Sequence, residues 1–216
     1  TYPKSDSAFV LIDMNHTLWQ KCAWANLRVE NDSTITGYKL VKGWGPERHI
    51  YFRAVFSKPF TDFMIYQNQK PVVYNTSRFR SNREAWGEGL MFTARFCTDD
   101  GEQITVRTAI SATGTDGAAV NMQELEGKTF DGVRREAYDR WNRELSRYVI
   151  EGSETQKRTF YTSAYHAALC PFVYDDADGK YLGLDKNVER EQGFTNLTVF
   201  SLWDTYRAFH PLMNLV

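Results

Sequence analysis

The amino-acid sequence predicts a protein of mixed α and β structure, in which an antiparallel β-sandwich is followed by a linker helix and by the first helices of an α-domain. Apolar side chains alternate with period two up to about Ser111, which is typical of strands that bury one face. From Thr129 the apolar residues recur with a helical period instead. Aromatic residues make up 15% of the chain, which suits a β-rich core and leaves binding of sugar rings open as the alternative.

Short alternating segments in the first half predict the strands of the sandwich. In IYFRAVFS, the residues expected to face inward are Ile50, Phe52, Ala54 and Phe56. In QITVRTAIS, the residues expected to face inward are Ile104, Val106, Thr108 and Ile110. The segments DFMIYQ and GLMFTARFC are similar, and turn-forming stretches such as NQKP and TDDGEQ separate the strands. Such short strands and turns favour an antiparallel sandwich.

An amphipathic helix is predicted over TFDGVRREAYDRWNRELSRYV. Its apolar stripe consists of Phe130, Val133, Ala137, Trp141, Leu145 and Tyr148. On its polar face, Glu136 with Arg140 and Asp139 with Arg143 have the acid-before-base spacing of stabilising ion pairs.

A second helix is predicted over SETQKRTFYTSAYHAAL. Ser153 and Gln156 have the spacing of a capping box at its start, and Pro171 is expected to stop it. We therefore expect a β-sandwich domain at residues 1–125, a helical linker at 126–150 and the start of an α-domain at 151–216. Because one or two helices cannot bury both their faces, the α-domain is expected to continue beyond the last residue. The opening TYPKSDSAF has no starting Met and no signal peptide, so the sandwich is expected to be incomplete at its N-terminus.

The composition argues against several classes of protein. With 26 basic and 27 acidic residues the net charge is −1, which gives no electrostatic reason to expect nucleic acid or an anionic membrane as a partner. No apolar run reaches the roughly 20 residues that a membrane-spanning helix needs. The three cysteines, Cys22, Cys97 and Cys170, are too widely spaced for a disulfide framework or a zinc site, and free buried thiols are expected.

Candidate metal sites are weak in the sequence. Asp176, Asp178 and Gly179 in DDADGK match half of a calcium loop, but the third acidic position and the distal Glu are missing, so a plain turn is expected. Paired ligand spacing is also missing among the histidines, which are His16, His49, His166 and His210. The sequence predicts no metal site and no catalytic residue within this chain.

The terminal segment TVFSLWDTYRAFHPLMNLV places Trp203 beside Asp204 in an otherwise apolar run. Ser201 can cap a helix with Asp204 as its reciprocal partner, which would make the acid structural. Alternatively, Trp203 and Asp204 form a substrate-binding pair, in which the indole stacks on a sugar and the carboxylate accepts hydrogen bonds from its hydroxyls. His210 precedes Pro211, so a helix is expected to kink or end nearby.

Several segments resemble glycoside hydrolase family 92, a family of bacterial exo-acting α-mannosidases. They are LIDMNHTLWQ, ITGYKLVKGWGPERHIYFRAVFSKPF, FDGVRREAYDRWNRELS, FYTSAYHAAL, DADGKYLGLD and, most specifically, FSLWDTYRAFHPL. The resemblance implies an N-terminal β-sandwich, linker helices and an (α/α)6 catalytic toroid, of which this chain would contain only the first helices. It also implies a calcium-dependent inverting enzyme that acts on mannose-containing glycans, with α-1,2 linkages as substrate, in the bacterial periplasm or outside the cell.

The resemblance gives the Trp-Asp-Thr motif a role in the pocket that holds the terminal mannose. It carries over to Asp204, with Trp203 as its neighbour, while Thr205 and Arg207 belong to the motif without an assigned contact. No position corresponds to the family's general acid, general base or calcium ligands, which are expected further along a longer chain. By itself the chain is therefore expected to be inactive. The alternative is a non-catalytic carbohydrate-binding or structural β-sandwich module.

Overall fold

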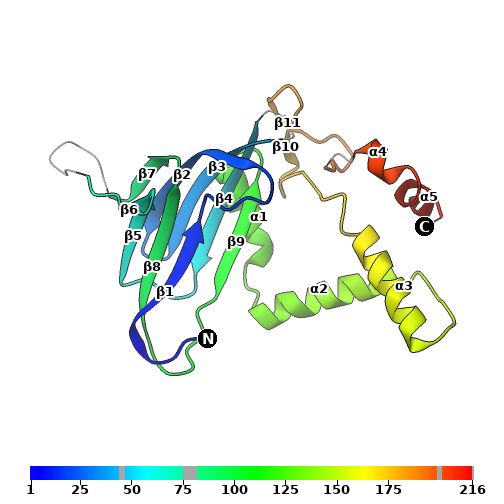
Figure 1. Cartoon of the computed structure of the whole chain (residues 1–216), viewed down its shortest axis with the longest axis horizontal. Coiled ribbons are helices and arrows are strands. Elements are labelled where there is room, and N and C mark those ends of the chain that lie inside the picture. Colours follow the sequence, from blue (N-terminus) through cyan, green and yellow to red (C-terminus); the bar gives the residue numbers. More distant parts are fainter. Residues whose placement is uncertain (44–46, 75–81, 199–200, 216) are drawn as a thin grey trace. The chain divides into compact units, whose positions relative to one another are not determined.

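The computed structural model describes residues 1–43, 47–74, 82–198 and 201–215. It contains antiparallel β-sheets and a few helices, as the sequence predicts (Figure 1). The chain forms two compact units, of which the first is Thr1–Glu126 with Asp176–Arg190 and the second is Gly127–Asp175 with Glu191–Val216. The boundaries expected at residues 125 and 150 stay predictions. None of the described helices is long and apolar enough to cross a membrane.

Two sheets pack face to face in the first unit. The four-stranded sheet has the order β1-β8-β5-β6, with bounds Ser5–Asp13, Leu90–Thr98, Asp62–Gln67 and Lys70–Pro71. The five-stranded sheet has the order β7-β2-β3-β4-β9, with bounds Glu84–Gly87, Lys21–Asn31, Thr34–Lys42, Arg48–Phe56 and Val106–Ser111. The strand pairs within both sheets are antiparallel. The predicted turn in NQKP joins β5 to β6, and both its central residues, Asn68 and Gln69, have positive φ.

The core between the sheets is aromatic. Its largest fully buried side chains are Phe92, Phe96, Leu27, Ile35, Ile65 and Leu90. The rings of Phe56, Phe60 and Phe96 lie within 6.4 Å of one another, centroid to centroid, in tilted and edge-on arrangements. The expected inward face of β4 is confirmed, since Ala54 and Phe56 are buried and Phe52 packs against the core. Several of the aromatic side chains therefore form part of the core.

The expected inward face of β9 is confirmed by its pairing with β4, but only part of that face is buried. Ile104, just before β9, and Val106 pack against the core, but Thr108 is exposed and Ile110 is 65% exposed. Thr108 and Ile110 are on the predicted face, since they lie opposite Ala54 and Phe52, but they stay exposed. Because β9 is an edge strand, these side chains have less of the opposite sheet to pack against. Alternation identifies the face of a strand, but the extent of the opposite sheet decides whether that face is covered.

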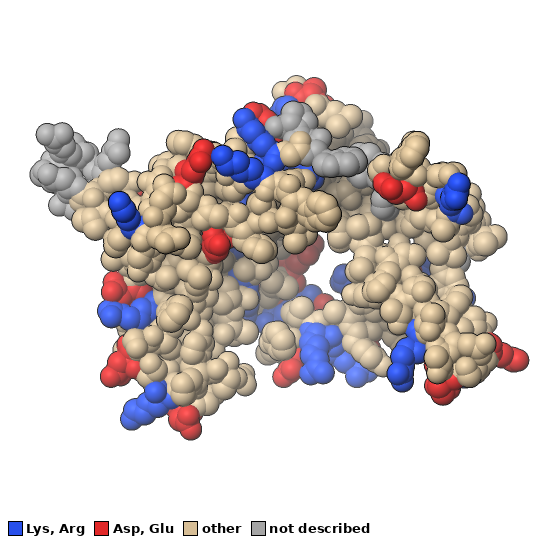
Figure 2. All heavy atoms as spheres, in the orientation of Figure 1, with Lys and Arg blue, Asp and Glu red and all other residues tan. Residues whose placement is uncertain are grey.

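Two further segments belong to the first unit, and the first of them lies on the outer face of the five-stranded sheet, away from the core. Helix α1, Thr115–Met122, packs against β9 and β4 and buries Ala118 completely, and a short 3-10 helix, Gln123–Leu125, follows it. The hairpin of β10, Lys180–Leu182, and β11, Val188–Arg190, belongs to the same unit (Figure 1). Figure 2 shows basic and acidic side chains interspersed over the visible surface, in keeping with the net charge of −1.

The second unit contains the predicted helices. Helix α2, Phe130–Leu145, begins after Thr129, whose hydroxyl accepts a hydrogen bond from the backbone N–H of Gly132. Helix α3, Glu154–Ala167, has the predicted capping box of Ser153 and Gln156, and it ends before Pro171. The rings of Trp141 and Tyr165 join the two helices with centroids 4.5 Å apart. Two further helices, α4 (Leu202–Thr205) and α5 (Phe209–Met213), follow near the end of the chain.

Two details of side-chain pairing differ from expectation. On α2, Asp139 pairs with Arg135 one turn earlier at 3.1 Å, and Glu136 pairs with Lys128 at 2.8 Å, instead of the pairs expected with Arg140 and Arg143. Each acid has more than one basic neighbour within reach, so spacing alone does not select the partner.

The cysteines are free, as expected, but they are not all buried. Cys22 is buried, Cys170 is intermediate and Cys97 is exposed on β8. Cys97 takes the outward position of an alternating strand, where the side chain of even an apolar residue faces solvent. Burial raises the pKa of the Cys22 thiol, so this side chain is a poorer nucleophile than an ordinary thiol.

Candidate functional site

Helix α4 carries both predicted substrate-binding residues. It is a single turn, in which the backbone N–H of Asp204 donates to the carbonyl of Ser201 at 3.0 Å. The Trp203 side chain is 87% exposed, and Asp204 is exposed as well. Consecutive residues on a helix point about 100° apart, so the indole and the carboxylate share one end of the turn without facing each other.

The capping interpretation of Asp204 is not supported by the geometry. The Ser201 hydroxyl makes no capping hydrogen bond, and the reciprocal bond expected from a capping box is also missing. Among the residues that the structure describes, no hydrogen bond or ion pair engages the Asp204 carboxylate. A helix of one turn also gains little from a cap, because few backbone groups depend on it. Substrate binding by Trp203 and Asp204 stays a prediction.

The neighbouring motif residues are engaged locally. The Thr205 hydroxyl lies 2.9 Å from Nε2 of His210 and donates to the Ser201 carbonyl at 3.2 Å. Nε of Arg207 donates to the hydroxyl of Tyr206 at 2.5 Å. Helix α4 ends at Thr205, before His210 and Pro211, where the kink or end was expected. These contacts hold the loop between α4 and α5 and give Thr205 and Arg207 a structural role here.

Pro211 does not cause the break in the way the sequence suggested. It lies in the first turn of α5, Phe209–Met213, where a missing backbone N–H is tolerated. The break comes earlier, at Ala208, whose φ of −125° and ψ of −52° are not helical. Trp203 and Asp204 are thus exposed, as are Tyr206 and Arg207 of the same motif.

A second cluster was not foreseen as a unit, and it lies in the first compact unit. We call it the Asp176 cluster, made of Asp176, Ser111, Thr113 and Asn121. The Asp176 side chain is only 4% exposed, and its Oδ2 accepts hydrogen bonds from the hydroxyls of Ser111 at 2.8 Å and Thr113 at 2.5 Å. Its Oδ1 accepts a hydrogen bond from Nδ2 of Asn121 at 2.7 Å.

The Asp176 cluster fixes the loop of residues 176–179 to the sandwich. The turn expected in DDADGK is present, because the Gly179 N–H donates to the Asp176 carbonyl at 2.8 Å. Asn121 Oδ1 also accepts from the backbone N–H of Ala177 at 2.6 Å. The only hint in the sequence was an acid inside a turn, since its donors lie more than 50 positions earlier.

The described residues do not form a calcium site. Calcium takes about 6–8 oxygen ligands, whereas both oxygens of Asp176 are already bound by hydroxyl and amide donors. Asp178 is paired with Lys180 at 2.7 Å, and this hydrogen bond lowers the pKa of its carboxyl. Oδ1 of Asp175 is buried without a hydrogen-bond partner in the described part of the chain, but one such oxygen is too few. No group of three or more acidic, His or Cys side chains gathers around a metal position in the described ranges.

Two domain models of one family match the chain. The model of the glycosyl hydrolase family 92 N-terminal domain matches residues 1–111, and the model of the glycosyl hydrolase family 92 catalytic domain matches residues 117–216. No match was found among the curated proteins.

Solved structures give a likeness over nearly the whole chain. The chain is 62% identical, with a TM-score of 0.94, to a family GH92 alpha-mannosidase from Bacteroides thetaiotaomicron. This match covers 99% of the present chain and 29% of the mannosidase chain. The same enzyme solved in complex with mannoimidazole gives the same identity and TM-score, with 28% of that chain covered. A family GH92 inverting mannosidase from Bacteroides thetaiotaomicron VPI-5482 is 25% identical, with a TM-score of 0.81, over 99% of this chain and 28% of that one. The chain therefore spans less than a third of the length of these relatives.

Proposed function

Because this chain belongs to glycosyl hydrolase family 92, we propose that it is part of an inverting exo-α-mannosidase that removes terminal mannose from glycans, with α-1,2 linkages as substrate. The observation that carries the proposal is the 62% identity, over 99% of this chain, to an alpha-mannosidase. A periplasmic or secreted bacterial location is part of the same proposal, because an enzyme in these places would have access to glycans that come from outside the cell.

The residues of this chain would bind and orient the sugar. An inverting hydrolase needs a general acid and a general base with carboxyl groups roughly 6.5–9.5 Å apart, leaving room for the attacking water. We assign both groups, and the rest of the catalytic domain, to the part of the protein that follows this chain. Asp204 would accept hydrogen bonds from mannose hydroxyls distant from the bond that breaks, and Trp203 would offer an apolar surface beside it. Both would act by positioning the substrate.

Calcium is a further part of the proposal. A bound calcium ion would supply a hard cation for a pair of sugar hydroxyls. Its ligands are assigned to residues outside this chain, because the described residues do not fit such a site. Removal of calcium with a chelator should abolish activity of the whole enzyme, and added calcium should restore it.

Hydrolysis of an α-1,2-linked mannobiose by the whole protein tests the function. Proton NMR during the first minutes should show β-mannose appearing before α-mannose, which is the signature of inversion. The same experiment with residues 1–216 alone should give no mannose. Immediate release of α-mannose would refute inversion, and a whole protein that releases no mannose from any α-linked mannobiose would refute the function. Activity of residues 1–216 alone would refute the assignment of acid and base to a later part of the protein.

A further inference from the structure

A band of uncharged side chains crosses the outer face of the four-stranded sheet. Its members face away from the core on β1, β8 and β5, and they are Phe9, Leu11, Met64, Tyr66, Met91 and Thr93. We call this set the outer band. Phe9 is 60% exposed, Leu11 is 52% exposed and the others are half-buried. The outer face of an antiparallel sheet normally carries polar side chains, so an uncharged and partly aromatic band needs an explanation.

The pairing of the strands places these side chains next to one another. Leu11 is opposite Thr93, and Thr93 is opposite Met64. Two positions further along, Tyr66 is opposite Met91. Directly opposite residues in an antiparallel pair point to the same face. The outer band is therefore continuous across β1, β8 and β5, which Figure 1 shows as neighbouring strands.

Charged side chains lie at both ends of the outer band. Arg95, which is opposite Phe9, pairs with Asp62 through a distance of 2.9 Å between Nη2 and Oδ2. Asp13 lies at the other end, where its Oδ1 accepts a hydrogen bond from the backbone N–H of Asn15 at 2.8 Å. Because these charged groups have partners of their own, we assign no ligand contact to them. The surface that remains between the two ends is uncharged.

The outer band contains a hollow of about 350 Å³, whose lining includes Phe9, Met64, Tyr66 and Thr93. Pockets of roughly 300–1,000 Å³ with apolar and aromatic walls and a few polar groups are typical of ligand sites. The polar groups of this lining are two hydroxyls. In the described part of the chain the Tyr66 hydroxyl has no hydrogen-bond partner, and the Thr93 hydroxyl donates to the Met64 carbonyl over a long 3.4 Å. Both hydroxyls are thus available to a ligand.

The chemistry of the outer band fits a neutral sugar chain better than other ligands. An extended peptide binds to free backbone groups at the edge of a sheet, whereas this hollow is on a face. A phosphate or an anionic lipid needs a free basic group, whereas Arg95 is paired with Asp62. A sugar has C–H faces that can stack on the ring of Phe9 and hydroxyls that can bond to Tyr66 and Thr93.

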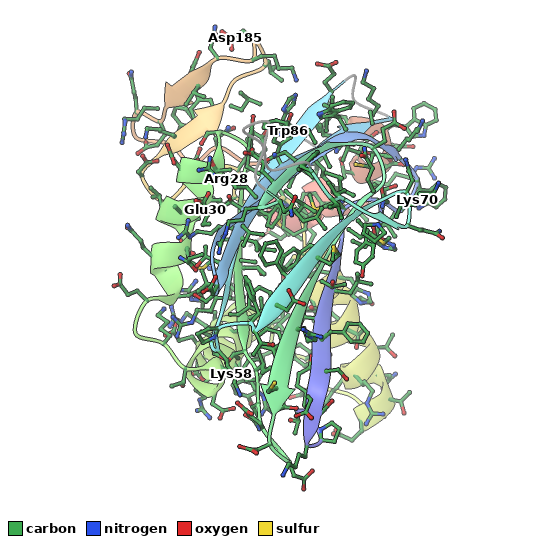
Figure 3. The ribbon with its side chains drawn as sticks, turned by 90° about the vertical axis from the view of Figure 1, so that its left-hand side faces the viewer. Arg28, Glu30, Lys58, Lys70, Trp86 and Asp185 are labelled. Carbon is green, nitrogen blue, oxygen red and sulfur yellow. The ribbon has the colours of Figure 1, made fainter. Side chains whose placement is uncertain are left out.

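The outer band lies on the opposite side of the sandwich from α1. Figure 3 views the two sheets from the side, with Arg28 and Glu30 toward α1 and Lys70 of β6 on the opposite side. Helix α1 packs against β9 and β4, which belong to the five-stranded sheet. A ligand can therefore occupy the outer band while α1 is in place.

We infer that the outer band binds a mannose-containing oligosaccharide, with a sugar ring on Phe9 and sugar hydroxyls bonded to Tyr66 and Thr93. The outer band belongs to the first unit, whereas Trp203 and Asp204 belong to the second. It is a second site for the proposed class of substrate, and it keeps a branched or polymeric glycan attached between successive cleavages. The inference rests on the proposed function only for the choice of mannose as the sugar.

Electrophoresis of residues 1–216 in native gels that contain soluble yeast α-mannan tests the site. Mannan should slow the migration of the original chain. Phe9→Ala should weaken binding roughly tenfold and so remove most of this retardation, because the stacking ring is lost. Trp86→Ala is the matched control, since Trp86 is 51% exposed on the other sheet, and it should migrate like the original chain. Equal retardation of Phe9→Ala and the original chain, or no retardation of either, would overturn the inference.

Two conservative variants separate binding from folding. Phe9→Leu keeps an apolar side chain without the flat ring, and Tyr66→Phe keeps the ring without the hydroxyl. Each should lower the affinity for mannan several-fold while the melting temperature stays that of the original chain. If both variants are retarded like the original chain, neither stacking nor the hydroxyl contributes and the inference is wrong.

The other sites and occupants give different results in the same experiment. If Asp204→Asn or Trp203→Ala abolishes the retardation of residues 1–216, the sugar is bound at α4 and the inference is wrong. It is also wrong if sedimentation shows a dimer that Phe9→Ala converts to a monomer, because the outer band then joins two copies. Equal retardation by hydroxyethylcellulose would refute the choice of mannose.

Failure of this inference can be told apart from failure of the proposed function. The gels measure binding by residues 1–216 and need no turnover. A whole protein that releases no mannose would refute the proposed function, and mannan binding lost in Phe9→Ala would still support the outer band. An active whole protein together with residues 1–216 that bind no mannan would refute the outer band alone.

Discussion

The hydroxyl of Ser111, at the end of β9, donates a hydrogen bond of 2.8 Å to Oδ2 of Asp176, which lies 65 positions later in the chain. This bond and its neighbours join the hairpin segment Asp176–Arg190 to the sandwich. Asp176 and Ser111 are buried and Thr113 and Asn121 are half-buried, so the contribution of the cluster to stability should be measurable.

Replacing Asp176 with Ala should lower the free energy of unfolding of the first unit by about 2–4 kcal/mol, because Ser111, Thr113 and Asn121 would lose the acceptor that they share. Denaturant unfolding of residues 1–216 measures this change. Asp178→Ala is the control, since Asp178 is partly exposed and mainly pairs with Lys180, and it should cost about 1 kcal/mol or less. If the two changes lower the free energy of unfolding equally, the Asp176 cluster contributes no more to stability than a partly exposed ion pair.

Replacing Gly117 with Ala should destabilise the protein although Ala favours helices. A Cβ at position 117 would lie 2.3 Å from Asp176 Oδ2 and 2.4 Å from Ser111 Oγ, so the cluster would have to open. The expected cost is about 1–3 kcal/mol, more than the gain of about 1 kcal/mol from helix propensity. Gly132→Ala in α2 is the matched control, because its nearest atom, Thr129 Oγ1, is 3.2 Å away. Thermal unfolding compares the two, and a Gly117→Ala protein as stable as the original would contradict the packing described.

Replacing Asp204 with Asn in the whole enzyme should lower kcat/KM about 10²-fold or more. Charge-assisted hydrogen bonds to a sugar contribute roughly 1.5–3 kcal/mol each, and about 1.4 kcal/mol corresponds to a factor of ten. Binding of mannoimidazole should weaken in parallel, while the melting temperature should barely change. Asp62→Asn, which alters an exposed acid paired with Arg95 on the sandwich, should leave all three unchanged.

The opposite result for Asp204 has a clear meaning. A variant that melts several degrees lower but keeps normal kcat/KM would show that the acid is structural, since an N-cap contributes about 0.5–2 kcal/mol. Trp203→Ala is a poorer test, because the loss of a large ring can change packing and binding together.

Acidification should remove part of the stability that Lys58 provides. Nζ of Lys58 donates to both Glu102 oxygens, at 2.8 and 3.0 Å, and this hydrogen bond lowers the pKa of Glu102 below its usual 4.5. Because the pKa is lower in the folded state, the stabilisation is present above about pH 4.5 and is lost as the pH falls through the folded-state value.

Melting temperatures of residues 1–216 between pH 7 and pH 3 measure this effect. Lys58→Met should lower the melting temperature at pH 7, and the difference from the original protein should shrink towards pH 3. Lys21→Met is the control, because Lys21 lies 3.9 Å from Glu88 with both side chains mostly exposed. A difference for Lys58→Met that stays constant with pH would contradict the role of the carboxylate.

Local patterns predicted most of the fold. The alternation over β4 and the capping box at Ser153 are both confirmed, because each depends on residues that are neighbours along the chain. The exposure of Ile110 could not be predicted in this way. It depends on the position of β9 at the edge of the sheet, which is a property of the whole topology.

The predicted substrate-binding pair and the Asp176 cluster also differ in how far the sequence could predict them. Trp203 and Asp204 stand out in the sequence because they are adjacent, although their role still depends on a substrate. The Asp176 cluster joins a strand end, a helix and a distant turn, and Asp176 looks like an ordinary turn residue until the chain is folded. Its burial at 4% exposure follows from the tertiary structure alone.

The order in which the chain is synthesised gives the Asp176 cluster a further consequence. A ribosome adds about 5–20 residues per second, so Asp176 follows Ser111, 65 positions earlier, by roughly 3–13 s. During that interval the strands of both sheets have been made, but the hydroxyls of Ser111 and Thr113 still lack their acceptor and the space beside Gly117 is open. The Asp176 cluster of a nascent chain is thus completed only after the helical segment 127–175 has been synthesised, so the first unit gains this part of its stability last.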